Sequence, residues 1–171
     1  MFEDRLTKLA RNLDRVAEKD LSRIAREKEI EELRRQAAVR LHEICRNLVS
    51  SINGKVKLVQ LELSPAGFDA AEFHDAAVHL FQMNAAGRVV QLSFRGTEPL
   101  VSTYELKTPY TLEGSIHWFN QEMLDRDEMK EHLLYYCLDR KGNQWRYQDT
   151  RTHKTGDVDE EYLVGLLEQI I

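Results

Sequence analysis

The chain has 171 residues and a formal net charge of -5 at pH 7, and 42% of its residues are hydrophobic. This length allows one domain with a substantial core, and the acidic balance gives no general attraction to nucleic acids or anionic membranes. No apolar run approaches the roughly 20 residues that span a bilayer, and the charged first residues lack the apolar core of a signal peptide. Two distant cysteines, Cys45 and Cys137, form no CxxC unit, so we expect a cytoplasmic protein without disulfides.

The first 52 residues predict a long amphipathic helix, because they contain no glycine or proline. Their apolar residues recur every three or four positions, which places them on one helical face. The members of this face that we consider interface candidates are Leu6, Leu9, Leu13, Val16, Ile24 and Leu33. The Asn53-Gly54 pair is typical of a left-handed helix end. We therefore predict a helical arm over residues 1–53 and a second region over residues 54–171.

The length of this helix raises the question of what covers its apolar face. A straight helix of fifty residues would extend roughly 75 Å, whereas residues 54–171 should form a globule about 35 Å across. One alternative is a break near residues 19–22, with Asp20 or Ser22 as N-cap. Another is a coiled coil with a second chain, although Asp20 and Lys28 interrupt a regular heptad pattern. In a third, the whole arm folds back on its own sheet.

After Gly54 the apolar period changes from about 3.6 to 2, which predicts short strands separated by turns. Short connections favour antiparallel pairing. The expected strands are 55–63, 77–83, 88–94, 100–106, 110–119, 132–139 and 144–152. Residues 120–131 are expected as a short helix or loop, and a closing helix should follow Asp157 as N-cap. The fold class is therefore α+β: a long N-terminal helical arm in one or two helices, an antiparallel sheet of six or seven strands, and a C-terminal helix.

Residues 68–81, FDAAEFHDAAVHLF, combine two histidines with three carboxylates. His74 and His79 are five positions apart, which fits neither a helical face nor one face of a strand. A zinc site needs three or four convergent ligands, so we predict no metal and no cofactor here, only a solvated turn that enters a strand. Ser115 and His117 share a strand face, but no GxSxG-like turn surrounds Ser115 to support catalysis.

The predicted hairpin at residues 140–154 is the one locally basic and aromatic stretch. Single-stranded nucleic acids stack on aromatic side chains beside basic grooves. However, the chain after residue 53 carries 12 basic and 19 acidic residues. Nucleic acid is therefore not the expected partner, and the reason for this basic hairpin stays open.

Two functional hypotheses follow. The leading one is a non-catalytic binding or assembly module that forms a homo-oligomer, in the simplest case a dimer, or binds a protein partner through the amphipathic helix. The alternative is a small-molecule-binding domain, with or without enzymatic activity, whose pocket lies between a curved sheet and a helix. Candidate lining residues are Tyr104, Trp118, Tyr135 and Trp145, and Gly114 would leave room or permit a bend. Without a catalytic motif, the sequence favours a protein that is not an enzyme.

Overall fold

The computed structural model describes residues 1–171, which divide into two compact units, Met1–Leu33 and Arg34–Ile171. The first unit is helical and belongs to α1 (Phe2–Asn53), a single α-helix that continues into the second unit. The break considered near residues 19–22 is absent. The helix ends at Asn53 as predicted, but the φ angle of Gly54 is not left-handed. Instead, the Asn53 side chain donates to the Leu61 carbonyl (2.9 Å) and accepts from its amide (2.8 Å).

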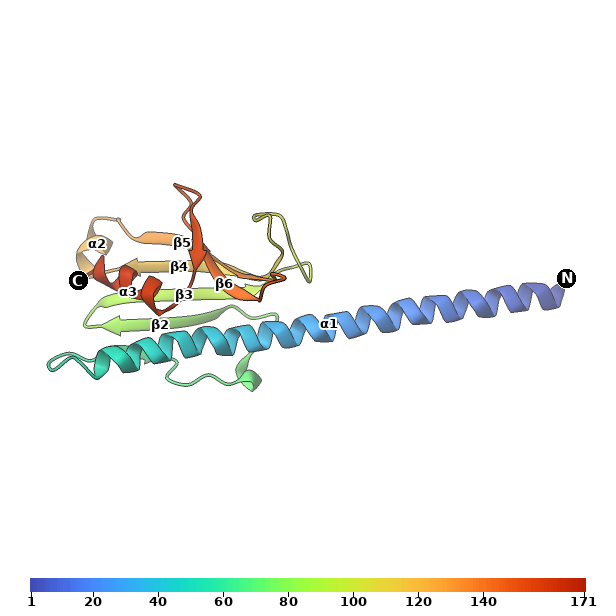
Figure 1. The fold of residues 1–171 in the computed structure, drawn as a ribbon, viewed down its shortest axis with the longest axis horizontal. Helices are drawn as coiled ribbons and strands as arrows, with labels where there is room; N and C mark the ends of the chain where they lie inside the picture. Colours follow the sequence, from blue (N-terminus) through green and yellow to red (C-terminus); the bar gives the residue numbers. More distant parts are fainter. The chain divides into compact units, whose positions relative to one another are not determined.

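The second unit is built on one seven-stranded antiparallel sheet, in which each strand pairs with its neighbours in the sequence (Figure 1). The strands are β1 (Glu62–Ser64), β2 (His79–Ala85), β3 (Arg88–Gly96), β4 (Tyr110–Phe119), β5 (Lys130–Cys137), β6 (Gln144–Gln148) and β7 (Thr155–Asp157). The further helices are η1 (Ala70–Glu72), α2 (Gln121–Asp125) and α3 (Glu160–Glu168). These elements confirm the predicted α+β class.

The turns agree with the sequence in most places. Ala86 and Gly87, with φ angles of 49° and 84°, form the tight turn of the β2–β3 hairpin, where Ala85 pairs with Arg88. Positive φ angles at both central residues are typical of a type I′ turn, whose twist matches the twist of two paired strands. The N-cap of α3 is Asp159 and not Asp157, since the Asp159 side chain accepts from the Tyr162 amide.

Residues 100–106 were expected as a strand and form a loop instead. Only Ser102 pairs with the sheet, through an isolated bridge to Tyr110. The Tyr110 hydroxyl also accepts from the Ser102 hydroxyl and from the Glu105 amide, both at 3.2 Å. These contacts hold the loop against one face of the sheet, which we call the outer face.

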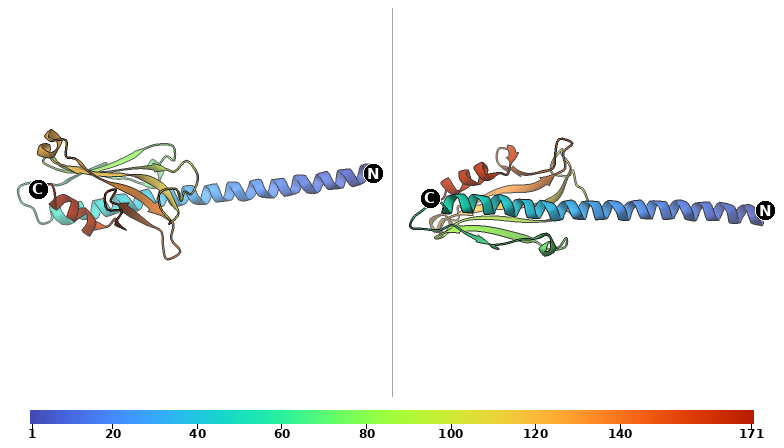
Figure 2. Two further views of the ribbon diagram at one scale, coloured as in Figure 1. Left: turned by 90° about the horizontal axis from the view of Figure 1, so that it is seen from above. Right: turned by 60° about the horizontal axis from the view of Figure 1, so that its bottom comes forward.

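The opposite face, the inner face, carries the main core. It packs against α3 and against residues 34–53 of α1 (Figure 2). The buried helix side chains in this core are Ala37, Ala38, Leu41, Cys45 and Leu48 from α1, with Leu163, Leu166 and Leu167 from α3. The indole nitrogen of Trp145 donates to the carbonyl of Ala37 at 2.8 Å, so a strand of the sheet and α1 share a buried hydrogen bond.

The outer face has a smaller core of Tyr110, Tyr135 and Cys137 beneath Leu106 and Leu133. Beside it, Gly114 lets β3 and β4 approach closely. A Cβ atom at Gly114 would lie 1.8 Å from the Ser93 carbonyl oxygen. The space that this glycine leaves is therefore filled by the neighbouring strand.

Candidate functional site

Large apolar side chains are exposed along the first part of α1. Leu6, Leu9, Leu13, Val16 and Ile24 are 43, 54, 61, 53 and 42% exposed, respectively, and Leu33 is half-buried. At 3.6 residues per turn, the first five side chains and Phe2 fall within an arc about 80° wide. We call these six residues (Phe2, Leu6, Leu9, Leu13, Val16 and Ile24) the apolar stripe.

The two edges of the apolar stripe differ in charge. Helical geometry places Arg5, Lys8, Asn12, Arg15 and Lys19 along one edge. It places Glu3, Thr7, Ala10, Asp14 and Ala17 along the other. One edge is therefore basic, and the other is neutral to acidic.

The four aromatic residues considered as pocket lining do not share a cavity. Tyr104 is 90% exposed on the loop before β4. Trp118 and Trp145 are buried on the inner face, and the Trp118 indole donates to the Gln169 side chain at 3.0 Å. Tyr135 lies on the outer face.

The stretch from 68 to 81 contributes packing and one ion pair. The His79 ring stacks between Phe73 and Phe94, with centroid distances of 5.1 and 5.4 Å. Asp75 pairs with Arg34 at 2.7 Å. No three His, Cys, Asp or Glu side chains gather closely enough to hold a metal ion.

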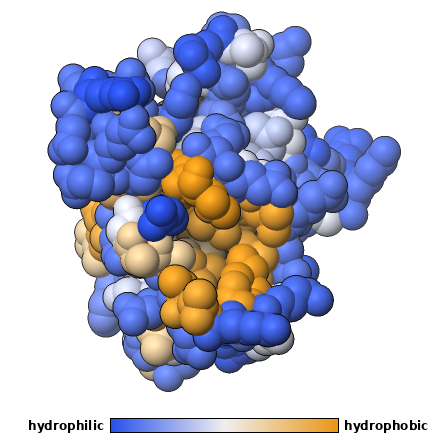
Figure 3. Space-filling model, turned by 90° about the vertical axis from the view of Figure 1, so that its left-hand side faces the viewer, coloured by the Kyte–Doolittle hydropathy of each residue, from blue (hydrophilic) through white to orange (hydrophobic).

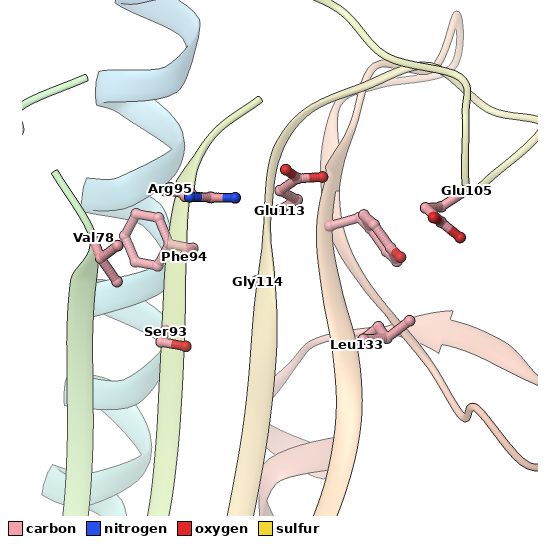
Figure 4. A pocket seen from close by; sticks show the side chains of 9 residues that line it. Val78, Ser93, Phe94, Arg95, Glu105, Glu113, Gly114 and Leu133 are labelled. Carbon is pink, nitrogen blue, oxygen red and sulfur yellow. The ribbon is translucent and has the colours of Figure 1, made fainter. Parts of the chain in front are cut away.

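A shallow cavity of about 440 Å³ opens on the outer face (Figure 4). Arg95 on β3 and Glu113 on β4 lie opposite each other in the register and extend to the same side. Burial, followed by the nearby carboxylates of Glu105 and Glu113, raises the pKa of Tyr135. This phenol therefore stays neutral and can only exchange hydrogen bonds.

A second cavity, of about 590 Å³, is lined by His132, Tyr147 and Asp149, and His132 also contacts Tyr162. The His132 Nδ1 atom lies 2.7 Å from the Tyr162 hydroxyl, and its Nε2 atom lies 3.8 Å from an Asp149 oxygen. The Tyr147 ring stacks on both the His132 and Tyr162 rings, at 5.1 and 4.2 Å. His132, Tyr147 and Tyr162 therefore form a cluster of three titratable aromatic side chains.

Burial sets the protonation of this cluster. It lowers the pKa of His132, against the opposing effect of the Asp149 carboxylate, and it raises the pKa of Tyr162. The Tyr162 phenol therefore keeps its proton, and in the His132 tautomer that carries its proton on Nε2 it donates to Nδ1. Sequence reasoning missed this cluster, because no spacing rule joins residues from β5, the segment after β6, and α3.

An apolar groove of about 550 Å³ lies at the end of the second unit where α1 stops (Figure 3). Its aliphatic lining residues are Ile52, Val56, Val59, Leu61, Ala85, Ala86, Val164, Leu167 and Ile171. Arg88 and Glu168 are the only charged residues that line it. The groove contains no aromatic residue, and nothing in the sequence patterns indicated it.

Comparison with protein-family models, curated proteins and solved structures finds no match to this chain. None of its helices combines the length and the apolar character that crossing a membrane requires.

Proposed function

We propose that this protein is a non-catalytic assembly module that forms a parallel homodimer through the apolar stripe. The observation that carries the proposal is the row of exposed side chains from Phe2 to Val16, spaced by four, three, four and three residues. This alternation is the heptad spacing with which two helices interlock their side chains. Monomeric helices rarely leave such a row in water.

The charge on the edges supports a parallel arrangement. In an antiparallel pair, each basic edge would face the basic edge of the second copy, so Arg5 and Lys19 would lie among like charges. In a parallel pair, the basic edge faces the edge that carries Glu3, Ala10 and Ala17. Residues at these flanking positions set helix orientation in coiled coils.

The dimer should be weak to moderate in affinity. The heptad row from Phe2 to Val16 covers only about two heptads, because Asp20 takes the next position of the row. This is shorter than the three to four heptads typical of a coiled coil. However, these residues belong to a helix that continues to Asn53 in the second unit. The second unit therefore already nucleates the helix, and dimer formation does not have to supply this unfavourable step.

Sedimentation velocity over a range of concentrations tests this proposal. We expect a dimer for the wild type, a monomer for Leu13→Glu, and a dimer for Ser22→Glu. Both variants add one negative charge to the same helix, but Ser22 lies on the side opposite the stripe. A wild type that stays monomeric at the highest concentration, or equal behaviour of the two variants, would contradict the proposal.

Orientation can be tested by oxidative crosslinking of Leu6→Cys. A parallel pair places the two sulfur atoms opposite each other, within disulfide range, whereas an antiparallel pair places each opposite a distant position. Cys45 and Cys137 are buried free thiols and should not compete in this reaction.

Burial also raises the pKa of Cys45 to about 12. Two unreactive thiols that form no disulfide support our proposal of a cytoplasmic location.

A second candidate function is binding of an aliphatic small molecule in the apolar groove. The observation that favours it is a lining made almost entirely of valine, leucine, isoleucine and alanine, with no aromatic residue and with Arg88 and Glu168 as the only charged ones. Its volume lies within the range of about 300–1,000 Å³ that is typical of ligand sites.

Titration with decanol, followed by NMR, tests this candidate. It should shift the resonances of residues that line the groove in the wild type and not in Val59→Glu. The exposed Val78→Glu is the matched control, and absence of saturable shifts in the wild type would remove this candidate.

A further inference from the structure

Two arginines of the second unit differ in how their hydrogen-bond donors are used. The Arg34 side chain is 3% exposed, and all three of its nitrogen atoms have acceptors. Nε donates to the Thr111 hydroxyl at 2.8 Å, Nη1 donates to the Asp75 carboxylate, and Nη2 donates to the Thr97 carbonyl at 3.1 Å. This guanidinium has no capacity left for a ligand, so its role is structural.

Arg146 on β6 presents the opposite case. Its Nε atom is covered from solvent and has no hydrogen-bond partner. Asp157 forms an ion pair with Arg146, with one carboxylate oxygen 3.6 Å from Nε, but this distance is too long for a hydrogen bond. Buried donors in folded proteins nearly always have an acceptor, so an exception calls for an explanation.

Arg146 lines a cavity of about 350 Å³ that is rich in donors. The cavity lies between the loop before β4 and the last strands of the sheet. Its other polar walls are Lys107, Thr108, Gln148, His153 and Thr155, and Glu105 is its only acidic residue. Amine, guanidinium, hydroxyl, amide and imidazole groups all donate hydrogen bonds, whereas only the Glu105 carboxylate is restricted to accepting them.

We propose that this cavity binds a small molecule through a phosphate group. Arginine presents a planar set of donors that suits phosphate oxygens, and Lys107 adds a second positive charge. The cavity falls within the size range of small-molecule sites, about 300–1,000 Å³, so it has room for more than the phosphate itself.

This assignment also accounts for the basic hairpin at residues 140–154, which the dimer proposal leaves unused. Arg146, Gln148 and His153 all come from this hairpin and the turn that follows it. The chain as a whole is acidic, so a local concentration of donors is not a by-product of its composition.

The test is an NMR titration of the full-length, isotope-labelled protein with inorganic phosphate and, separately, with acetate, at constant ionic strength. We expect saturable shifts from phosphate in residues 105–108 and 146–155, and weaker or no shifts from acetate. Arg146→Gln should weaken phosphate binding at least about tenfold, because it removes a charge-assisted contact.

Arg140→Gln is the matched control, since it makes the same charge change in the same hairpin at a residue that does not line the cavity. It should leave phosphate binding unchanged. Lys107→Gln tests the site from the loop, without altering a strand, and should also weaken binding. The proposal is overturned by absence of saturable shifts, by equal losses in Arg146→Gln and Arg140→Gln, or by equal affinity for acetate.

Discussion

The guanidinium of Arg34 donates two hydrogen bonds, of 2.7 and 2.9 Å, to the carboxylate of Asp75, and so ties α1 to the segment before β2. Replacing Arg34 with methionine leaves acceptors on Thr97, Thr111 and Asp75 without their donor. We expect the free energy of unfolding to fall by about 2–3 kcal/mol, because buried polar groups without a hydrogen-bond partner are costly. The loss is limited because the half-exposed Asp75 can regain water. Urea denaturation measures this change.

The exposed ion pair between Glu122 and Arg126, at 2.8 Å, provides the control. Both side chains are well exposed, so Glu122→Ala should cost less than about 1 kcal/mol. Similar losses in Arg34→Met and Glu122→Ala would show that burial does not strengthen the Arg34 contacts.

The His132 cluster predicts a pH dependence of stability. Because burial holds the pKa of His132 below its ordinary value of 6.5, the unfolded chain binds a proton more readily than the folded chain. Stability from this residue is therefore present above about pH 6.5 and is lost as the pH falls through the folded pKa. Denaturation curves between pH 5 and 7 should show a smaller pH slope for His132→Gln than for the wild type.

The control for this prediction is His74→Gln, since the His74 side chain is exposed. It should retain the wild-type pH slope. Asp149 titrates in a separate window. A hydrogen bond from the Arg151 amide lowers its pKa from 3.8, so its contribution to stability is lost only in more acidic solution. An unchanged slope in His132→Gln would mean that another group is responsible.

Gly114 predicts a steric effect between β3 and β4. An added Cβ would lie 1.8 Å from the Ser93 oxygen and 2.7 Å from the Phe94 Cα, so the two strands must separate. Gly114→Ala should lower stability by about 1–3 kcal/mol or more, as expected for overpacking. Gly165→Ala, in α3, meets no atom within 4 Å, and should raise stability by about 0.5–1 kcal/mol. Thermal unfolding should show lower stability for Gly114→Ala and higher stability for Gly165→Ala. If both changes were stabilising, the result would contradict the close approach of β3 and β4.

The long helix could be predicted from sequence because its signals are local. The potential N-caps at residues 19–22 do not interrupt it. Each further helical residue gains a backbone hydrogen bond without a new nucleation step, whereas Asp20 and Ser22 lower helix propensity only slightly. Continuation therefore outweighs the local preference for a break.

Other features depend on contacts between distant residues. Alternation over residues 100–106 suggested a strand, but the Tyr110 hydroxyl holds this segment as a loop. His132 on β5 and Tyr162 on α3 are 30 positions apart in the chain, and only the folded structure brings them into contact. The basic character of the 140–154 hairpin was visible in the sequence, whereas the missing hydrogen bond of the Arg146 Nε atom depends on the packing around it.

The apolar stripe leads to a last prediction, on hydrogen exchange. Isolated helices are only marginally stable in water, and their amides open readily. If a second copy covers the stripe, amides between Leu6 and Ile24 should exchange more slowly as the protein concentration rises. Amides between Ala37 and Leu48 lie in the buried core and should be protected at every concentration.

Mass spectrometry at two concentrations that differ about a hundredfold would measure this exchange, since that range shifts a dimer equilibrium by about 2.7 kcal/mol. Leu13→Glu should exchange rapidly in the stripe at both concentrations, and Ser22→Glu should behave as the wild type does. Concentration-independent exchange of the wild-type stripe would indicate that the helix is stable without a second copy. The exposed leucines would then need another partner, because nothing along residues 2–24 buries them.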